Sequence, residues 1–398
     1  MTNRLLPDWL DGFLEYTENS EPPRTFRLWV GISTIASMLK RKCQICWGPI
    51  NFFPNLYIVL VSPPGQARKG TAMSFGIEMQ IRSGIKMCAD SITKEALVRK
   101  IAEAMTTDIQ DDASMKFHSS YTIVSPELTS LLGNGDPQMI SWLTDWFDCG
   151  KGSDGIWEYV TKHQGEDRIA GIWVNLMGAT TPDLIGKIPD IIGSGLSSRI
   201  IFIYEHKQEK ICARPHMSPE QLVLKEKLYH DLELIQLMQG EFKVTQDFLD
   251  YWTEWYTAQS LEPPFQDKRL ARYCTRRGTH VMKISMVCSA SRSDEMIVTG
   301  EDLQRAIKFL TQAEIKMPYT FGSMGESPMA STLNNLMLDI GQAGRISQQE
   351  LLKRHYYDIG NQRVFEDMLI ILEKQGYCRR INVQGTGTVI EHIKLTRS

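Results

Sequence analysis

Apolar residues follow different patterns in successive parts of the chain. In residues 1–48 they recur at helix spacing, with Trp9, Leu10, Phe13 and Tyr16 as the first set, which predicts an N-terminal helical segment. Between 49 and 206 short continuous apolar runs take over, and they lie at 56–61, 121–124, 172–177 and 200–204. Such runs are typical of strands that are buried on both faces of a parallel sheet.

Helix-like segments such as 94–105 and 137–147 separate these runs. Strands that alternate with helices predict an α/β domain with a mainly parallel sheet over 49–206. Residues 207–317 have a helical pattern, which we interpret as a helical lid domain. The Gly, Ser and Pro residues of 318–330 predict a linker.

The last part of the chain, 331–398, predicts a small module of its own. Helices are expected at 331–341, 347–355 and 361–375, and two short strands at 377–382 and 388–394 flank the turn 384–387. Three helices followed by a hairpin is the order of a winged helix.

Composition places few limits on this picture. Apolar residues make up 42% and charged residues 23%, with a net charge of −3, as in ordinary globular domains. No run approaches the roughly 18–20 apolar residues of a membrane span, and the first residues lack a secretion signal, so a cytoplasmic protein is expected. Cys43 and Cys46 form a lone CxxC, for which core packing is favoured over a metal site.

The segment after the first apolar run carries the main candidate chemistry. A phosphate-binding loop needs a buried strand, a glycine-containing turn and a helix whose N-terminus faces the phosphates. We expect Lys69 to bind the phosphates and Thr71 to hold Mg²⁺. The predicted nucleotide-binding residues are Gly65, Gln66, Ala67, Arg68, Lys69, Gly70 and Thr71. Arg68 contacts phosphate or is only a solvated neighbour, and a chance Gly–Lys–Thr cluster is the alternative, because the spacing departs from GxxxxGK[ST].

Polar residues at the ends of the next two runs are candidates for the reaction itself. Glu127 follows 121–124 and would polarise the attacking water, or it only favours a helix N-terminus. Pro126 stands where an Asp is common, so Ser125 is the candidate that would hold an Mg²⁺-bound water. Thr180 is the first candidate to orient the water and Asn175 the second. A helix cap before Pro182 is the alternative for Thr180.

Two arginines raise questions that the sequence leaves open. Arg199 ends the turn 193–199 and fits an arginine finger that stabilises charge on the γ-phosphate, in a neighbouring subunit's site; an intramolecular salt bridge is the alternative. Arg277 falls on the apolar stripe of a helix, where a lone charge is costly. It reaches the nucleotide from the lid or makes a structural salt bridge.

The stretch 268–292 has seven Lys or Arg and no Asp or Glu, which predicts contact with a polyanion or a solvated helix face. In the C-terminal module the third helix and the hairpin would meet DNA, although 330–398 has a net charge of only +2 and winged helices also bind proteins. The candidate DNA-binding residues are Arg269, Arg272, Arg276, Lys283, Arg363, Arg379 and Arg380. Weaker candidates for channel loops are Lys151, Lys162 and His163.

The segments 54–71, 125–128, 178–182 and 195–199 resemble a family of phage-, prophage- and plasmid-borne P-loop ATPases that is described as replicative-helicase-like or primase-associated. The resemblance covers roughly residues 5–290. It implies a ring-forming ATPase of the RecA-like or AAA+ kind, with a hexamer expected, that acts in mobile-element DNA replication and has ATP and Mg²⁺ as cofactors. Lys69 and Thr71 would be the phosphate and Mg²⁺ ligands, Glu127 the catalytic carboxylate and Arg199 the trans-acting arginine.

Three functions follow from these residues. The first is an ATP-driven helicase or translocase that moves single-stranded DNA through a central channel, with a primase as a possible partner. The second is a replication initiator or loader in which ATP acts as an assembly switch with slow hydrolysis. The third is a degenerate P-loop scaffold that binds proteins and hydrolyses nothing.

Overall fold

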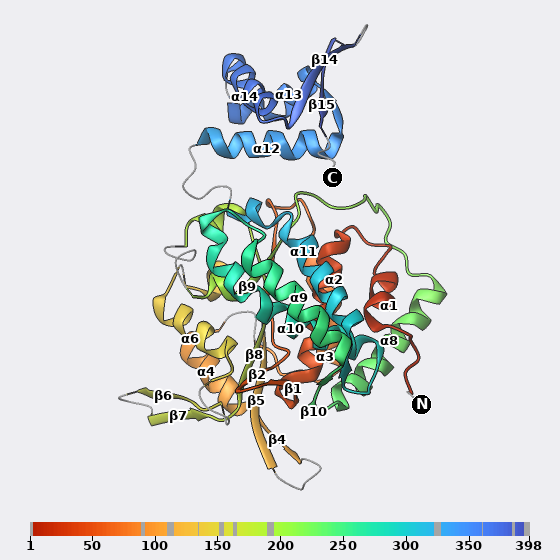
Figure 1. Ribbon diagram of the computed structural model, residues 1–398, viewed down its shortest axis with the longest axis vertical. Coiled ribbons are helices and arrows are strands. Elements are labelled where there is room, and N and C mark those ends of the chain that lie inside the picture. Colours follow the sequence, from red (N-terminus) through yellow and green to blue (C-terminus); the bar gives the residue numbers. More distant parts are fainter. Residues whose placement is uncertain are drawn as a thin grey trace. The chain divides into compact units, whose positions relative to one another are not determined.

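The computed structural model describes residues 3–88, 92–109, 115–133, 135–150, 155–161, 165–188, 195–321, 328–359, 361–383 and 387–393. The chain divides into two units, Met1–Thr320 and Phe321–Ser398 (Figure 1). The division falls inside the predicted linker 318–330. The expected boundaries near 48 and 206 instead lie within the first unit, so the N-terminal segment, the sheet and the following helices form one body.

A five-stranded sheet in the order β4–β5–β8–β3–β9 forms the centre of the first unit. Its strands are β4 (Met105–Ile109), β5 (Met115–Ser125), β8 (Ile172–Thr180), β3 (Tyr57–Val61) and β9 (Ile200–Tyr204). The last four run parallel, and β4 pairs antiparallel with β5 at the edge. The four apolar runs of the sequence are these four parallel strands, and the α/β class is confirmed.

Helices cover both faces of the sheet, which explains why all five residues of β3 are buried. Asn175 of β8 donates to Ser33 Oγ on α2 (Arg24–Leu39) at 3.0 Å. Tyr57 of β3 donates to the carbonyl of Leu143 on α6 (Pro137–Phe147) at 2.9 Å. Tyr57 pairs with Leu176, the neighbour of Asn175, and adjacent strand residues point to opposite faces. Helices α2 and α6 therefore lie on opposite sides of the sheet.

Helix α3 (Lys69–Arg82), which follows the candidate loop, is fixed against α2 by a close approach at Gly76. A Cβ at this position would lie 2.6 Å from Val30 Cγ1 and 2.8 Å from Thr34 Oγ1. Both neighbours are β-branched residues on a helix and have little rotamer freedom. Only glycine lets α3 pack here, so Gly76 fixes the direction in which the loop leads.

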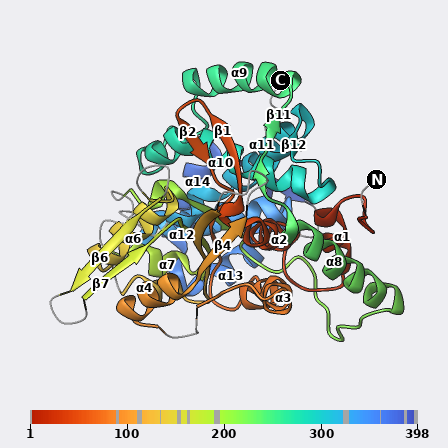
Figure 2. The same cartoon turned by 90° about the horizontal axis from the view of Figure 1, so that it is seen from below.

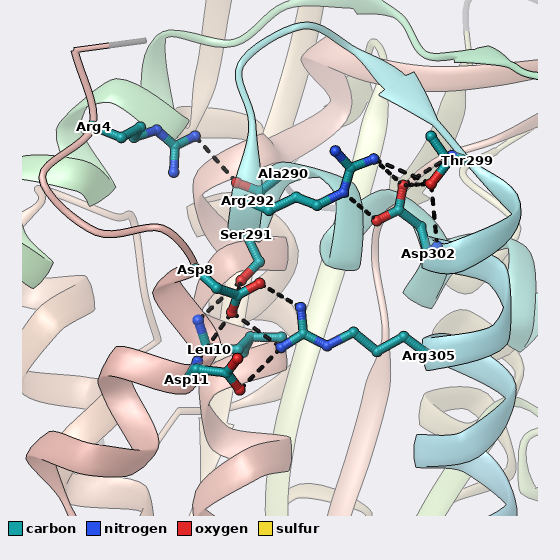
Figure 3. A network of polar contacts seen from close by, with 10 residues as sticks. All are labelled: Arg4, Asp8, Leu10, Asp11, Ala290, Ser291, Arg292, Thr299, Asp302 and Arg305. Atoms are coloured by element: carbon teal, nitrogen blue, oxygen red, sulfur yellow. Dashed lines mark hydrogen bonds and ion pairs between the residues drawn. The ribbon is translucent and has the colours of Figure 1, made fainter.

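The N-terminal helix α1 (Trp9–Tyr16) is bound to α10 (Ala271–Arg292) and α11 (Gly300–Glu314). Figure 3 shows the polar network that joins them: Asp8 accepts from Ser291 Oγ at 2.8 Å and from Arg305, which also contacts Asp11 at 3.2 Å. Because these contacts span almost 300 residues of sequence, the predicted lid helices are packed against the N-terminal segment. The other helices in this unit are α4 (Lys94–Glu103), α5 (Leu128–Leu131), α7 (Pro182–Gly186), α8 (Pro219–Leu237) and α9 (Gln246–Leu261).

Two antiparallel hairpins extend from the amino ends of the parallel strands. One is the β4–β5 pair, and the other is β6 (Trp157–Thr161) with β7 (Gly165–Ile169), inserted between β5 and β8. Figure 2 shows β6 and β7 as a ribbon beside α6, and the Trp157 ring of β6 lies 5.6 Å from the Trp142 ring of that helix. Short strands form two further small sheets: β1 (Cys43–Trp47), β2 (Ile50–Phe52) and β10 (Gly240–Glu241), and then β11 (Lys243–Val244) with β12 (Ile297–Val298).

The second unit contains three helices and a three-stranded antiparallel sheet in the order β13–β15–β14. Its elements are α12 (Pro328–Ala343), β13 (Arg345–Ser347), α13 (Gln348–Ile359), α14 (Gln362–Lys374), β14 (Cys378–Val383) and β15 (Gly387–His392). Leu336, Leu351, Phe365 and Leu369 are fully buried in its core. The predicted helices and hairpin are present, and β13 is an additional strand that the apolar pattern does not reveal.

Among the described residues, none of the helices has the combination of length and apolar character that crossing a bilayer requires.

Candidate nucleotide-binding site

The candidate residues gather where the parallel strands end. Val61 at the end of β3 pairs with Thr180 of β8 and with Tyr204 of β9, and Ser125 of β5 pairs with Gly178. Parallel strands place their carboxyl ends at one edge, which is where ligands bind in open α/β sheets. The loop after β3, Glu127 after β5 and Thr180 therefore share this edge.

The loop between β3 and α3 is anchored at its second half and exposed around its glycine. Gly65 and Arg68 have left-handed backbones, with φ of 70° and 54°, a conformation that costs a non-glycine residue energy. Arg68 is held by an ion pair with Glu21 at 2.8 Å, and Ala67 is fully buried. Gly65, Gln66, Gly70 and Thr71 are exposed. Arg68 is thus anchored to Glu21 within the chain, and its contact with phosphate stays a prediction.

Lys69 begins α3, and its ammonium is held by neutral oxygens. Its Nζ donates to the Ser62 hydroxyl at 2.7 Å and to the Ser62 carbonyl at 2.9 Å. Burial lowers the pKa of Lys69 to about 8, and the charge of Glu127 opposes this shift. No carboxylate among the described residues forms an ion pair with Lys69. A cation that is partly desolvated and paired only with neutral groups is suited to bind an anion.

Glu127 and Ser125 lie close together at the end of β5. Ser125 Oγ donates to the Glu127 carbonyl at 2.9 Å, and Glu127 Oε1 accepts from Thr129 Oγ1 at 3.0 Å. The Glu127 side chain is exposed, and its charge acts on Lys69. The structure therefore brings Glu127 to the loop, as the sequence predicts.

The two candidates on β8 lie in different surroundings. Thr180 ends the strand, and its carbonyl accepts from Ser62 N at 3.5 Å, so it borders the loop. Asn175 lies in the middle of the strand and is fully buried. Its Oδ1 accepts from Leu56 N at 2.9 Å and its Nδ2 donates to Ser33 and Ser37 on α2. The prediction that Asn175 orients a water is wrong, because its amide joins the sheet to α2.

Arg199 lies at the opposite end of the sheet from Lys69. Ile200, the next residue, pairs with Tyr57 at the start of β3, so the length of the strand, about 16 Å, separates Arg199 from the loop. Its guanidinium is 7% exposed, forms an ion pair with Asp148 and donates to the Gly195 carbonyl at 2.8 Å. The same carboxylate accepts from Arg276 at 3.1 Å. Within one chain Arg199 makes the intramolecular salt bridge; residues 193 and 194 of its predicted turn lie outside the described residues.

Arg277 makes the structural salt bridge that was one of its two predicted roles. Its Nε and Nη2 donate to the Glu314 carboxylate at 2.6 and 2.8 Å. Both side chains are buried, and the Trp255 ring lies 5.1 Å from the guanidinium. The assignment of Arg277 to the nucleotide is therefore wrong, because its guanidinium N–H groups already donate to Glu314 on α11.

Most of the predicted DNA-binding residues are engaged within the chain. Lys283 is 4% exposed and donates to Asn55 Oδ1 at 2.5 Å, so its assignment to DNA is wrong. Residues 271–292 form one continuous helix despite Gly278, and much of it is core. Arg269 pairs with Asp267 and Arg276 with Asp148, Arg379 pairs with Glu391, and Arg380 pairs with both Glu366 and Glu373. Arg272 and Arg363 are exposed.

Two residues of this edge were missed by sequence reasoning. Ser62, which holds Lys69, is the first polar residue after the β3 run. Glu205 directly follows the β9 run, is 8% exposed, and accepts from Thr25 Oγ1 and from Lys316 Nζ at 2.6 Å each. Each comes directly after a buried apolar run, as Ser125 does after 121–124, so the same rule would have found both.

Among the described residues, no group of three or more His, Cys, Asp or Glu side chains is arranged to hold a metal ion. The Thr71 and Ser125 hydroxyls and the Glu127 carboxylate are nevertheless oxygen donors at one edge. Mg²⁺ often takes only one or two protein ligands and completes its shell with phosphate and water. This set of donors fits an Mg²⁺ ion that arrives with a nucleotide.

Compared with models of known protein families and with curated proteins, the chain matches none of them.

Proposed function

We propose that this chain is a P-loop ATPase that acts on DNA as a ring of identical chains, as a helicase or translocase of a mobile genetic element. One observation carries the proposal: the Lys69 ammonium is held by neutral Ser62 oxygens at the end of buried strand β3, beside Glu127 and Thr180. This arrangement supports a RecA-like or AAA+ core with ATP as the nucleotide.

Each residue has a distinct task in this proposal. The exposed backbone of 65–66 and the N-terminus of α3 face the phosphates, and Lys69 binds them. The Thr71 hydroxyl and Ser125 hold Mg²⁺ and its water. Glu127 polarises the attacking water, which Thr180 orients. Glu127 suits this role because its carboxylate is exposed and, among the described residues, accepts a hydrogen bond from Thr129 alone.

The position of Arg199 supports action between chains. A guanidinium about 16 Å from its own loop along β3 cannot reach its own γ-phosphate, so it would serve a neighbouring chain. This requires chains joined head to tail, as in the proposed ring, with a hexamer expected. The inserted β6–β7 hairpin is the proposed DNA contact in the channel; Lys151, Lys162 and His163 lie outside the described residues. Recruitment of a primase stays a prediction.

A second candidate function, an ATP-switched initiator or loader with slow hydrolysis, is favoured by two features. Pro126 occupies the place of an Asp that would support Mg²⁺. The Ser125 hydroxyl, the other candidate for Mg²⁺, donates a hydrogen bond to the Glu127 carbonyl. In addition, Asp148 holds Arg199 within its own chain. Both features predict slow turnover by a chain that is not assembled.

The second unit supports a winged helix, because its order of elements places a short strand between the first two helices and a hairpin after the third. Its charges favour protein contact over DNA contact. Arg379 and Arg380 are neutralised by carboxylates, and α14 exposes Ile370 and Ile371 by 38% and 39%. Arg363 is the exposed basic residue at the start of this helix.

ATP turnover with and without single-stranded DNA tests the proposal on wild type, Lys69→Ala and a control, Lys210→Ala, which removes an exposed lysine. DNA-stimulated turnover that Lys69→Ala abolishes and the control retains supports the motor. Nucleotide-dependent oligomers with negligible turnover support the switch. A wild-type chain that binds no nucleotide overturns both functions and leaves the scaffold.

A further inference from the structure

A cavity of about 620 Å³ lies at the amino ends of the strands, whereas Lys69 lies beyond their carboxyl ends at the opposite edge of the sheet. Its walls come from the segment before β1, from β2, from the β4–β5 hairpin and from the base of β6–β7. His118, one of its residues, directly precedes Ser119, which pairs with Ile172 at the start of β8. The cavity is therefore distinct from the nucleotide loop, and its volume is in the range of ligand sites.

Positive charge dominates the walls. Arg41, Lys42, Lys116 and Arg168 line the cavity against the carboxylates of Asp108 and Glu241. Glu241 pairs with Lys243, Asp108 Oδ2 lies 2.8 Å from His118 Nε2, and Arg168 pairs with Glu158 at 3.4 Å. Arg41, Lys42 and Lys116 are then the cations that face the Asp108 carboxylate across the cavity. Lys116 is exposed and makes no ion pair with any described residue. The cavity thus presents an excess of cations to an anionic ligand.

Flat groups accompany these charges. Phe117 lines the cavity with half of its surface exposed, and the exposed Met115 lines it as well. The Arg41 guanidinium lies 4.3 Å from the centre of the Phe53 ring, and hydrogen bonds to the carbonyls of Cys149 and Ile172 hold it there. Aromatic rings and guanidinium planes are the surfaces on which unpaired bases stack.

We propose that this cavity binds a segment of single-stranded nucleic acid, with a base against Phe117 and the adjoining phosphates on Lys116 and its basic neighbours. The combination of rings and lysines favours a polynucleotide over an acidic peptide, since a peptide carboxylate needs the charges but not the rings. The inference rests on the proposed function. It names a contact site for the DNA that is separate from the nucleotide loop.

The test measures binding of a labelled oligo-dT by fluorescence anisotropy, with the full chain in a Lys69→Ala background and without nucleotide. We expect Phe117→Ala to weaken binding about tenfold through lost stacking. Lys116→Ala should reduce the slope of log K against log salt by about 0.7, the value for one phosphate on a single strand. Lys308→Ala, an exposed lysine on α11, is the control and should change neither quantity.

The outcomes separate this inference from the proposed function. Phe117 and Lys116 are exposed, so circular dichroism should show unchanged folding. An abasic strand should bind the parent chain and Phe117→Ala equally, and oligo-rU tells whether RNA serves as well as DNA. The inference is overturned if Phe117→Ala and Lys116→Ala bind the strand as the Lys308→Ala control does. It is also overturned if polyglutamate displaces the strand and Phe117→Ala weakens the binding of polyglutamate to the same extent. If the two substitutions weaken DNA binding but the wild-type chain shows no ATP turnover, the inference stands and the proposed motor function is overturned.

Discussion

The Lys69 ammonium lies 2.7 Å from the hydroxyl oxygen of Ser62, and the carbonyl of the same serine accepts a second hydrogen bond at 2.9 Å. Ser62 is the first residue after the buried strand β3, and it is itself fully buried. The lysine is thus oriented by the end of the strand on which the loop is built. If a phosphate bound here, its charged oxygens would replace the neutral Ser62 oxygens as partners of the Lys69 ammonium.

The state of Lys69 predicts how ATP affinity depends on pH. Because burial lowers its pKa to about 8, the free chain loses this charge above pH 8, whereas bound phosphate favours the ammonium. Affinity should be constant between pH 6.5 and 7.5 and then fall by up to about tenfold per pH unit above 8. Isothermal titration at pH 8.5, in two buffers with different heats of ionisation, should show proton uptake. Lys69→Arg, which stays charged, should show no such uptake; a flat wild-type affinity up to pH 9.5 would contradict this cause.

A mixing experiment tests whether Arg199 acts on a neighbouring chain. Lys69→Ala and Arg199→Ala should each lower turnover by about a thousandfold. In an equal mixture, an intact loop next to an intact Arg199 occurs at about one interface in four, so about a quarter of wild-type turnover should return. A mixture as inactive as its components would mean that Arg199 serves its own chain or only the fold. Nucleotide binding by Arg199→Ala alone, checked by equilibrium dialysis, should be intact.

The Arg277–Glu314 pair predicts a large effect on stability without an effect on the nucleotide. Arg277→Ala leaves a buried carboxylate without its partner and should lower the free energy of unfolding by about 3–5 kcal/mol. The double variant Arg277→Met with Glu314→Leu removes both charges and should be less destabilised in urea unfolding than Arg277→Ala. Its remaining loss should come from the buried Tyr273 hydroxyl, which donates to Glu314 at 3.0 Å in the wild type. The ATP affinity of the double variant should be unchanged, and a loss of affinity in this folded variant would restore Arg277 to the nucleotide.

Lys283 predicts a pH dependence of stability. Its ammonium lies 4.2 Å from the centre of the Phe147 ring, and burial lowers its pKa from 10.5 to about 8. Between pH 8 and pH 10.5 Lys283 is therefore more fully protonated in the unfolded chain than in the folded one. Stability from this group therefore rises with pH from about 8 to 10.5, by at most about 1.4 kcal/mol per unit. Urea unfolding at pH 7.5 and 9.5 should show a smaller rise for Lys283→Met than for wild type, and equal rises would refute the assignment.

The sequence was most informative where one segment determines its own structure. The continuous apolar run at β3 needs only burial on both faces to become a strand, and Gly65 and Lys69 follow it directly. Glu127 and Thr180 could be placed at the same edge because parallel strands end together. These inferences used local pattern and a single rule of topology.

The errors concern polar residues whose partners lie far away in the sequence. The sequence alone favours Asn175 as a reactive group, because its partners Ser33 and Ser37 are about 140 residues away on α2. The sequence pattern leaves Arg277 open between a nucleotide and a salt bridge and assigns Lys283 to DNA, whereas Glu314 and Asn55 satisfy these two residues within the fold. The β4–β5 extension escaped notice because Met105 and Ile109 are exposed strand residues without the apolar continuity of a core strand.

In the proposed function, the separation of Lys69 from Arg199 along β3 gives each chain two unlike poles, one that would receive a nucleotide and one that would complete the nucleotide site of the next chain. A two-fold dimer joins like surfaces and cannot match these poles repeatedly. Chains joined through them must follow one another head to tail, closing into a ring or growing as a filament according to the rotation between them. In such an assembly, a defect at Arg199 impairs the neighbour's nucleotide site and leaves the defective chain's own site complete.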